Sequence, residues 1–82
     1  MSQDNCKTIY QQLKYCGKDV IIYPLAKIIK PDVIKIDDHS RIDDFVFING
    51  GNGVKIGKYV HIASFVSVIG GGYLELGDYS AI

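Results

Sequence analysis

The stretch GGNGVKIGKY, residues 50–59, has the glycines and the lysine of a possible phosphate-binding loop. A P-loop requires G-x-x-x-x-G-K followed by Ser or Thr, because its backbone cradles the phosphates and the hydroxyl binds the metal ion. Here Asn52 stands where the first glycine belongs, and Tyr59 follows Lys58. The counterpart 20 residues later, GGGYLELGDY, has Asp78 in place of Lys58. We therefore predict that this stretch is a turn between structural repeats.

Composition excludes several classes of function. Nine basic and nine acidic side chains cancel over 82 residues, so no broad field would recruit nucleic acid or an anionic membrane. No apolar run reaches the roughly 18 residues of a spanning helix, and the N-terminus is too polar for a signal peptide. Cys6 and Cys16 lack a metal-ligand spacing, and we expect both to be reduced structural thiols. These features predict one small, soluble, cytoplasmic domain.

Aliphatic residues recur every six positions, and this period organises the chain. Successive sets slip by two residues, so three hexads and a two-residue insertion form a repeat of 20 residues. Fixed periods of this kind are typical of solenoid proteins. The equivalent anchors are Ile36, Ile56 and Leu76; Ile22, Ile42, Ile62 and Ile82; and Ile28, Ile48 and Val68.

Strand alternation assigns an inward or outward direction to each position of the hexad. The residue two places before each anchor faces inward with it, and the residue between them faces outward. Glycine-containing pairs such as Gly57-Lys58 follow the anchors as corners. Three hexads then form a triangular coil, and the coils stack as parallel strands about 4.8 Å apart. The sequence therefore predicts an all-β parallel β-helix, since the hairpin spacing of a sandwich and the helical periods of an α/β fold are both missing after residue 20.

Residues 3–16 differ from the repeats and have apolar positions at helical spacing. Asp4 is the expected N-cap, and Gly17 is the expected end of this helix. A solenoid needs its end covered, so we predict an N-terminal helical cap over residues 1–17 and a β-helix over residues 18–82. Because Ile82 ends partway through a coil, we also expect the β-helix to be truncated at its C-terminus. The apolar helical positions are Cys6, Ile9, Tyr10, Leu13 and Cys16.

The hexads IDDFVF, IGKYVH, IASFVS and LGDYSA resemble those of the hexapeptide-repeat acyltransferases. The segments at residues 20–51 and 56–72 are similar, more narrowly, to sugar acyltransferases of surface-polysaccharide pathways. The resemblance covers nearly the whole chain from residue 17 onward. It implies a left-handed parallel β-helix, a homotrimer, and transfer of an acyl group from acetyl-CoA to a hydroxyl or amine of a sugar or nucleotide-sugar. It is specific for the fold and much less specific for the substrate.

In this family a histidine acts as the general base, in a cleft between subunits. The resemblance assigns that role to His61, which lies between two inward residues in YVHIAS and so faces outward. Arg41 occupies the same position one coil earlier, where its charge would disfavour a protonated imidazole. Arg41, Asp43, Asp44 and Asn49 are candidates for binding the acceptor sugar. The structural alternatives are a subunit-contact histidine and acidic corners that keep the solenoid soluble.

The remaining candidates favour structural roles. His39 aligns with Tyr59 and Tyr79 at a corner, and Phe45 aligns with Phe65 as a second stacked pair. A γ-type carbonic anhydrase would need three zinc-binding histidines, and this chain has only two, at non-equivalent positions, so no metal is predicted. The alternative function is a non-catalytic, trimerising β-helix.

Overall fold

Short strands joined by tight corners account for most of the structure. A computed structural model describes residues 8–69 and 72–82. The helical elements are α1 (Ile9–Gln12) and the 3-10 helix η2 (Pro31–Val33). The strands are β1 (Tyr15–Cys16), β2 (Ile21–Ile22), β3 (Lys27–Ile29), β4 (Ile34–Ile36), β5 (Arg41–Ile42), β6 (Phe47–Asn49), β7 (Val54–Ile56), β8 (His61–Ile62), β9 (Ser67–Ile69) and β10 (Leu74–Leu76).

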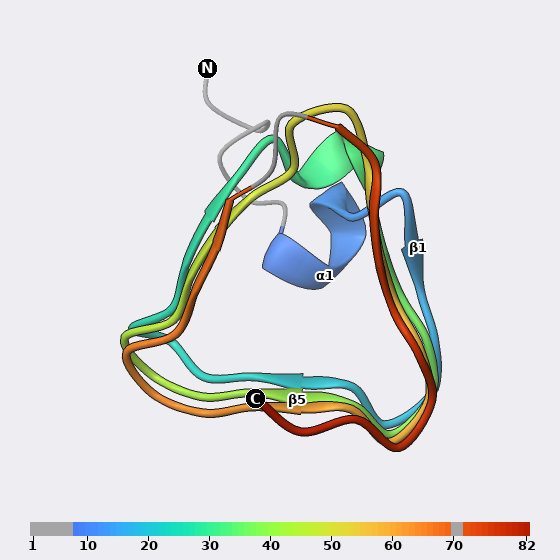
Figure 1. Ribbon diagram of the computed structural model, residues 1–82, viewed down its shortest axis with the longest axis vertical. Coiled ribbons are helices and arrows are strands. Elements are labelled where there is room, and N and C mark those ends of the chain that lie inside the picture. Colours follow the sequence, from blue (N-terminus) through green and yellow to red (C-terminus); the bar gives the residue numbers. More distant parts are fainter. Residues whose placement is uncertain (1–7, 70–71) are drawn as a thin grey trace.

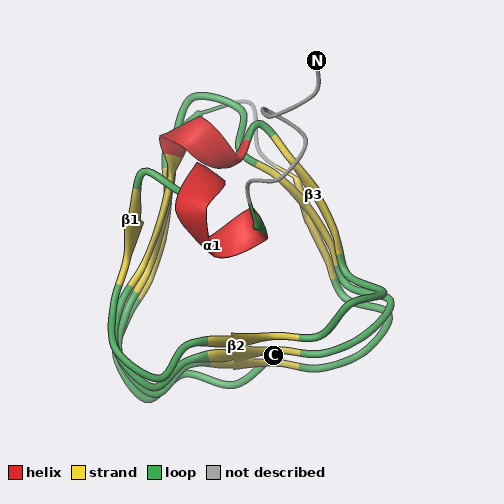
Figure 2. Cartoon of the chain, turned by 180° about the vertical axis from the view of Figure 1, so that it is seen from behind, coloured by secondary structure: helices red, strands yellow, loops and turns green. Residues whose placement is uncertain are grey.

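The strands build three parallel sheets that form the sides of a triangular coil (Figure 1). The sheet orders are β1-β4-β7-β10, β2-β5-β8 and β3-β6-β9. Figure 2 shows strands along all three sides and loops at the corners. Paired residues lie one repeat apart, as Ile36 pairs with Ile56 and Ile42 with Ile62. The predicted parallel β-helix is thus confirmed, whereas its left-handedness remains a prediction from the resemblance.

The predicted anchors fill the interior of the coil. Full burial of an aliphatic side chain contributes roughly 1.5–3 kcal/mol, so the stacked anchors are the main source of stability. Val46 and Val60, two places before their anchors, are also buried. Leu76 is half-buried and Ile82 is exposed, because the described structure places a coil on only one side of them. Six isoleucines are 0% exposed, namely Ile34, Ile36, Ile42, Ile48, Ile56 and Ile62.

Ser40 occupies an inward position and is the one buried polar side chain among residues 8–69 and 72–82. Its hydroxyl donates a hydrogen bond to the carbonyl of Gly57 and accepts one from the backbone N–H of Val60 at 3.0 Å. Ser40 therefore satisfies two backbone groups of the following coil as that chain turns a corner. A buried N–H group without an acceptor is costly, which explains a polar side chain in an aliphatic interior.

Replacing Ser40 by alanine is expected to lower the free energy of unfolding by about 1–3 kcal/mol, because the Val60 N–H loses its acceptor. Chemical denaturation of the two proteins measures this difference. The control is Ser80→Ala, since Ser80 has the equivalent hexad position but its hydroxyl donates only to Gly77 in an exposed turn. Equal losses in the two variants would contradict this role for Ser40.

Aromatic residues take an unusual backbone conformation at two of the three corners. His39, Tyr59 and Tyr79 have φ values of 63°, 55° and 64°, in the left-handed region that costs a non-glycine residue about 1 kcal/mol or more. Their rings form a ladder, with centroids 4.8 Å apart between His39 and Tyr59 and 5.3 Å apart between Tyr59 and Tyr79. Phe45 and Phe65 stack in the same way at the second corner, 5.5 Å apart. Stacking offsets part of the backbone cost, and both predicted alignments are confirmed.

Gly57 marks a close approach between consecutive coils. A Cβ atom at this position would collide with the Asp78 side chain and would lie 2.9 Å from the Asp78 backbone nitrogen. Gly77, at the equivalent position of the next coil, has open space around its Cα. The glycine at the first site is therefore required by packing.

We expect Gly57→Ala to lower the free energy of unfolding by about 1–3 kcal/mol through this overpacking. Gly77→Ala is the matched control, because the same methyl group meets nothing within 4 Å. Thermal unfolding followed by circular dichroism compares the two variants. A melting temperature of Gly57→Ala at or above that of Gly77→Ala would show that the close approach does not constrain this position.

The N-terminal helix is much shorter than predicted. It spans Ile9–Gln12, and its cap is Thr8, whose hydroxyl accepts a hydrogen bond from Gln11 N while Gln11 Oε1 accepts one from Thr8 N. The predicted cap Asp4 and the predicted helix residue Cys6 lie outside the described residues.

Tyr15 and Cys16, which lie within the predicted helical range of residues 3–16, instead form β1 and pair with Lys35 and Ile36. Parallel pairing prevails here because a helix of this length is marginal on its own. Ile9 and Leu13 still pack against the core, and α1 lies within the triangular outline of the coils in Figure 1. Within the part of the chain that the structure describes, no helix has the length and apolar character needed to span a membrane.

Candidate functional site

The sheet β2-β5-β8 positions the two residues most suited to chemistry. Arg41 on β5 pairs directly with His61 on β8, and Ala81 continues the column as a bridge partner of His61. The neighbouring Ile42 and Ile62 are fully buried, so alternation forces Arg41 and His61 to face outward. The sequence predicted both the outward direction and the alignment, and the structure shows both.

Asp43 joins Arg41 and His61 into one cluster. The Asp43 carboxylate lies 2.9 Å from His61 Nε2 through Oδ2 and 3.3 Å from Arg41 Nε through Oδ1. Arg41 Nη2 lies 3.1 Å from His61 Nε2 and 3.5 Å from His61 Nδ1. The Asp43 side chain is 25% exposed, against 38% for His61 and 48% for Arg41. Each member contacts the other two, and the carboxylate is the most enclosed of the three.

These contacts indicate how the neutral imidazole is protonated. Nε2 cannot both donate to Asp43 and accept from Arg41, and Arg41 already has a carboxylate partner. We therefore assign the ring proton to Nε2, which donates to Asp43, and the lone pair to Nδ1. A histidine oriented in this way by a carboxylate has the arrangement of a general base.

The backbone explains why Asp43 reaches the ring. Asp43 follows β5 two positions after Arg41, and its backbone nitrogen donates to the carbonyl of Ile62 at 3.0 Å. This hydrogen bond holds Asp43 against the end of β8, diagonal to His61. From the sequence, Asp43 was predicted only to bind the acceptor, and no orienting carboxylate was predicted for His61. Asp43 could have been predicted as that carboxylate, because it faces outward two residues after Arg41, and Arg41 lies one coil before His61.

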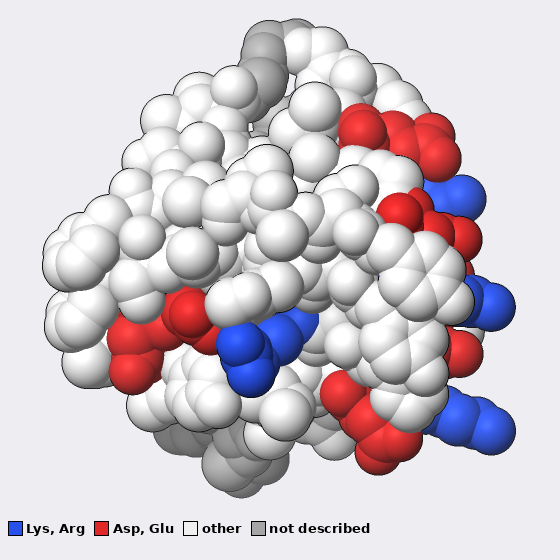
Figure 3. Space-filling view, turned by 60° about the horizontal axis from the view of Figure 1, so that its bottom comes forward, with Lys and Arg blue, Asp and Glu red and all other residues white. Residues whose placement is uncertain are grey.

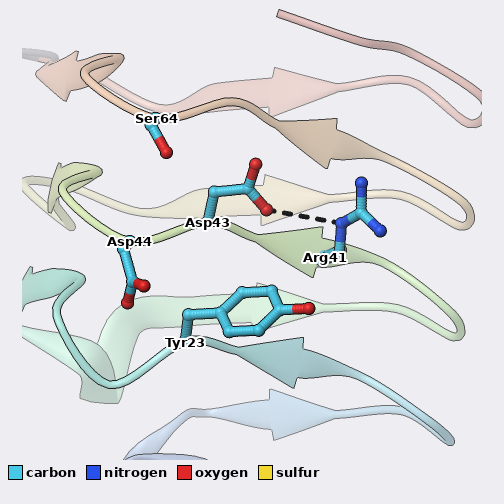
Figure 4. Close-up of a pocket in the computed structure, with 5 residues that line it drawn as sticks. All are labelled: Tyr23, Arg41, Asp43, Asp44 and Ser64. Carbon is cyan, nitrogen blue, oxygen red and sulfur yellow. Dashed lines mark ion pairs between the residues drawn. The ribbon is translucent and has the colours of Figure 1, made fainter.

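A surface hollow of about 380 Å³ adjoins the cluster (Figure 4). In Figure 4 the Tyr23 ring lies below Asp43 and Arg41, with the Asp44 carboxylate and the Ser64 hydroxyl on the other side of the opening. Two of the lining residues, Arg41 and Asp43, contact His61, which does not itself line the hollow. A ligand in the hollow would therefore lie next to residues that contact the imidazole. The lining residues are Tyr23, Arg41, Asp43, Asp44 and Ser64.

Sequence analysis included three of these lining residues and missed Tyr23 and Ser64. Tyr23 is the residue one coil before Asp43, and Ser64 is the residue one coil after Asp44. Both could have been found from the 20-residue period, by taking the residues 20 positions before and after each predicted site residue. Asn49, in contrast, does not line the hollow. It ends β6 in a different sheet, and its side chain accepts a hydrogen bond from Gly51 N at 3.1 Å.

Asp44 also has a structural contact. Its Oδ1 accepts the backbone N–H of Leu25 at 2.9 Å. Asp38 and Asp78 make the same kind of bond across consecutive coils at another corner, to the backbone nitrogens of Lys18 and Lys58. A carboxylate that caps the previous coil is therefore a recurring feature of the corners, and Asp44 alone among the three opens onto the hollow.

Charge is unevenly spread over the surface. Figure 3 shows an acidic patch beside a basic one on the face of β2, β5 and β8, within largely uncharged surroundings. Acidic and basic side chains also alternate along the right-hand edge of that view. The 20-residue register stacks Lys18, Asp38, Lys58 and Asp78 in such an alternating column. The corner charges thus follow from the register of the repeat.

The glycine-rich stretch at residues 50–59 has no amides available for phosphate. Gly53 N donates to the carbonyl of Gly50 at 2.7 Å, and Gly57 N donates to that of Leu76 at 2.9 Å. Lys58 N donates to the Asp78 carboxylate at 2.8 Å. Gly51 and Gly53 have φ values of 52° and 131°, which glycine adopts without strain. The stretch is the turn that closes one coil and begins the next.

Two other reactive groups lie away from the cluster. His39 Nδ1 is 3.5 Å from Asp19 Oδ2, at the aromatic corner. Burial raises the pKa of the Cys16 thiol, which disfavours the thiolate that a nucleophile would need. Across residues 8–69 and 72–82, no three His, Cys, Asp or Glu side chains gather as metal ligands.

The fold and the site together define a parallel β-helix with an arginine–aspartate–histidine cluster on one outer sheet, beside an open hollow. No protein-family model, curated protein or solved structure matches this chain.

Proposed function

We propose that this chain is a hexapeptide-repeat acyltransferase that transfers an acyl group, in the simplest case acetyl from acetyl-CoA, to a sugar or nucleotide-sugar. The observation that carries the proposal is the Asp43–His61 pair, whose aspartate lines the hollow. The hexad resemblance supplies the reaction class, and the cluster supplies the group that this reaction class requires. We also propose, from the same resemblance, that the β-helix is left-handed, that the protein is a homotrimer and that it acts in the cytoplasm.

The groups around the hollow suit a polyhydroxylated acceptor. A carboxylate and two hydroxyls, from Asp44, Tyr23 and Ser64, offer hydrogen bonds to sugar hydroxyls, and the Tyr23 ring offers an apolar face. The small number of directed polar groups beside an aromatic ring is typical of small-ligand sites.

Proton removal is the chemical step that the chain's own residues support. His61 Nδ1 takes the proton of the acceptor hydroxyl or amine as that atom bonds to the acyl carbon, and it gives the proton to the donor sulfur as the carbon–sulfur bond breaks and the free thiol leaves. Between these two transfers Asp43 stabilises the imidazolium and keeps Nε2–H directed toward itself. Arg41 holds the Asp43 carboxylate from its other oxygen. General-base assistance of this kind contributes about 10²–10⁴-fold to a rate.

The hollow does not fit the phosphates of coenzyme A. Its one cationic lining residue, Arg41, is already paired with Asp43, and no lysine lines it. We therefore assign the hollow to the acceptor and give its lining residues no part in holding the donor's phosphates.

Release of free thiol from acetyl-CoA in the presence of neutral, amino and uronic sugars tests the proposal. We expect thiol release that depends on the sugar, with an acylated sugar detected by mass spectrometry. Hydrolysis of acetyl-CoA at the same rate with and without every sugar would contradict acyl transfer by this chain.

A non-catalytic, self-associating β-helix is the second candidate, favoured by exposed apolar side chains at one corner. Leu25, Phe45 and Phe65 stack in one column there, and Phe65 is 82% exposed. Sedimentation of the protein and of Phe65→Ser tests association through this column. Association without any acyl transfer would favour the second candidate over the first.

A further inference from the structure

The hollow beside His61 carries a net negative charge, which has a consequence for the acceptor. Arg41 contributes one positive charge and Asp43 and Asp44 contribute two negative charges, so the formal sum is 1 − 2 = −1. The Arg41–Asp43 ion pair at 3.3 Å cancels within itself. The charge that remains for a ligand is that of Asp44.

Some polar atoms of the hollow already have partners within the protein, and others could bind a ligand. Asp43 binds Arg41 and His61 with its two oxygens, whereas Asp44 uses Oδ1 for the backbone of Leu25. Within the described residues, Asp44 Oδ2 and the hydroxyls of Tyr23 and Ser64 have no hydrogen-bond partner. The available set is therefore one anionic oxygen and two hydroxyls around the same opening (Figure 4).

In Figure 4 the Asp43 carboxylate lies toward Arg41, whereas the Asp44 carboxylate points away from the Asp43 carboxylate. Of the two aspartates, Asp43 makes the ion pair with Arg41. A ligand group that enters between Asp44 and Ser64 meets an anion and a hydroxyl, and no unpaired cation. Such an environment attracts an ammonium group and repels a carboxylate or phosphate.

We propose that the hollow selects an acceptor sugar that bears a primary amine over neutral and anionic sugars, and that Asp44 is the selecting residue. The inference rests on the proposed function for the identification of the hollow as an acceptor site. It deepens that function by naming the class of acceptor. A partly exposed pair of opposite charges is worth up to about fivefold in affinity, and we expect about threefold here.

The test measures affinity rather than turnover. Glucosamine, glucose and glucuronate are titrated separately at pH 7 into the protein, with amide chemical shifts or calorimetry as the readout. Glucosamine is expected to bind about threefold more tightly than glucose, with glucuronate weaker than both, and 0.5 M NaCl is expected to reduce these differences. Equal affinities for the three sugars would overturn the proposal.

Asp44→Asn isolates the charge, because the asparagine oxygen can still accept the Leu25 N–H bond. The preference for glucosamine over glucose is expected to vanish in this variant. Asp38→Asn is the matched control, since Asp38 makes the same bond to a backbone nitrogen at a corner away from the hollow. An unchanged preference in Asp44→Asn, or an equal loss in Asp38→Asn, would overturn the role of Asp44.

A second variant tests the idea by gain of charge. Ser64→Asp adds an anion on the exposed side of the hollow and is expected to increase the glucosamine preference by a similar factor. No increase would count against the inference even if Asp44→Asn fails to fold. Selective binding without acyl transfer would refute the proposed reaction and leave the selection intact, whereas transfer to neutral sugars without an amine preference would refute only the selection.

Discussion

Replacing Ile62 by aspartate is expected to abolish the folded state. Ile62 has no exposed surface and stacks between Ile42 and the chain at Ile82, to which its coil is joined by backbone hydrogen bonds. Loss of the aliphatic side chain alone costs about 2–5 kcal/mol, and an unpaired buried carboxylate costs several kcal/mol more. The sum is comparable with the 5–15 kcal/mol of stability of a typical domain.

Far-ultraviolet circular dichroism and denaturant titration measure this effect. Ser67→Asp is the control, because it introduces the same carboxylate at an outward, exposed position on the adjacent sheet. We expect Ser67→Asp to stay within about 0.5 kcal/mol of the unchanged protein. A cooperative transition in Ile62→Asp with the midpoint of the control would contradict the stacked interior.

Replacing His61 by alanine is expected to lower the rate of acyl transfer by about 10²–10⁴-fold, because the reaction loses its general base. The assay is the thiol release described above, under saturating acetyl-CoA and acceptor. His39→Ala is the matched control: it removes the second histidine of the chain, which lies in the aromatic corner ladder. Unchanged turnover in His61→Ala would refute the assignment of the base, and equal losses in both variants would point to a structural effect.

Asp43→Asn gives a related test of the positioning residue. Loss of the carboxylate charge leaves the imidazolium without its counter-ion, so we expect kcat to fall by up to about 10⁴-fold with little change in the KM for the sugar. Asp44→Asn should act in the opposite way, on KM. A merely structural role for Asp43 would lower the amount of folded protein and leave kcat per folded molecule unchanged.

The architecture could be predicted from the sequence because each coil of a β-helix repeats the same pattern of inward and outward residues. Equivalent residues lie one coil apart, so the same inward position is occupied by an aliphatic residue three times, at Ile36, Ile56 and Leu76. The alignment of Arg41 with His61 and the stacking of Phe45 on Phe65 follow from the same period. These features depend on backbone register alone, which the spacing of anchors determines.

The parts that could not be predicted depend on side-chain reach or on local competition. Asp43 bonds to His61 along a diagonal between columns, and register alone does not say which way a carboxylate turns. Asn49 faces a different turn and satisfies Gly51, although its residue type suits a sugar site. The helix ended early because Tyr15 and Cys16 gain a parallel partner strand, a contact distant in sequence.

The turn at residues 50–53 determines where this molecule can accept changes in length. It lies in the chain between Asp43 and His61, yet it stands at the corner between β6 and β7, away from the sheet that carries both residues. A loop inserted there would extend into solvent and leave both columns in place. A single residue added within 57–60 would instead exchange the inward and outward faces of β8, with His61 turned to the core and Ile62 to water. The turn at residues 50–53 is thus the natural place to insert a lid or a recognition loop over the hollow without moving the histidine.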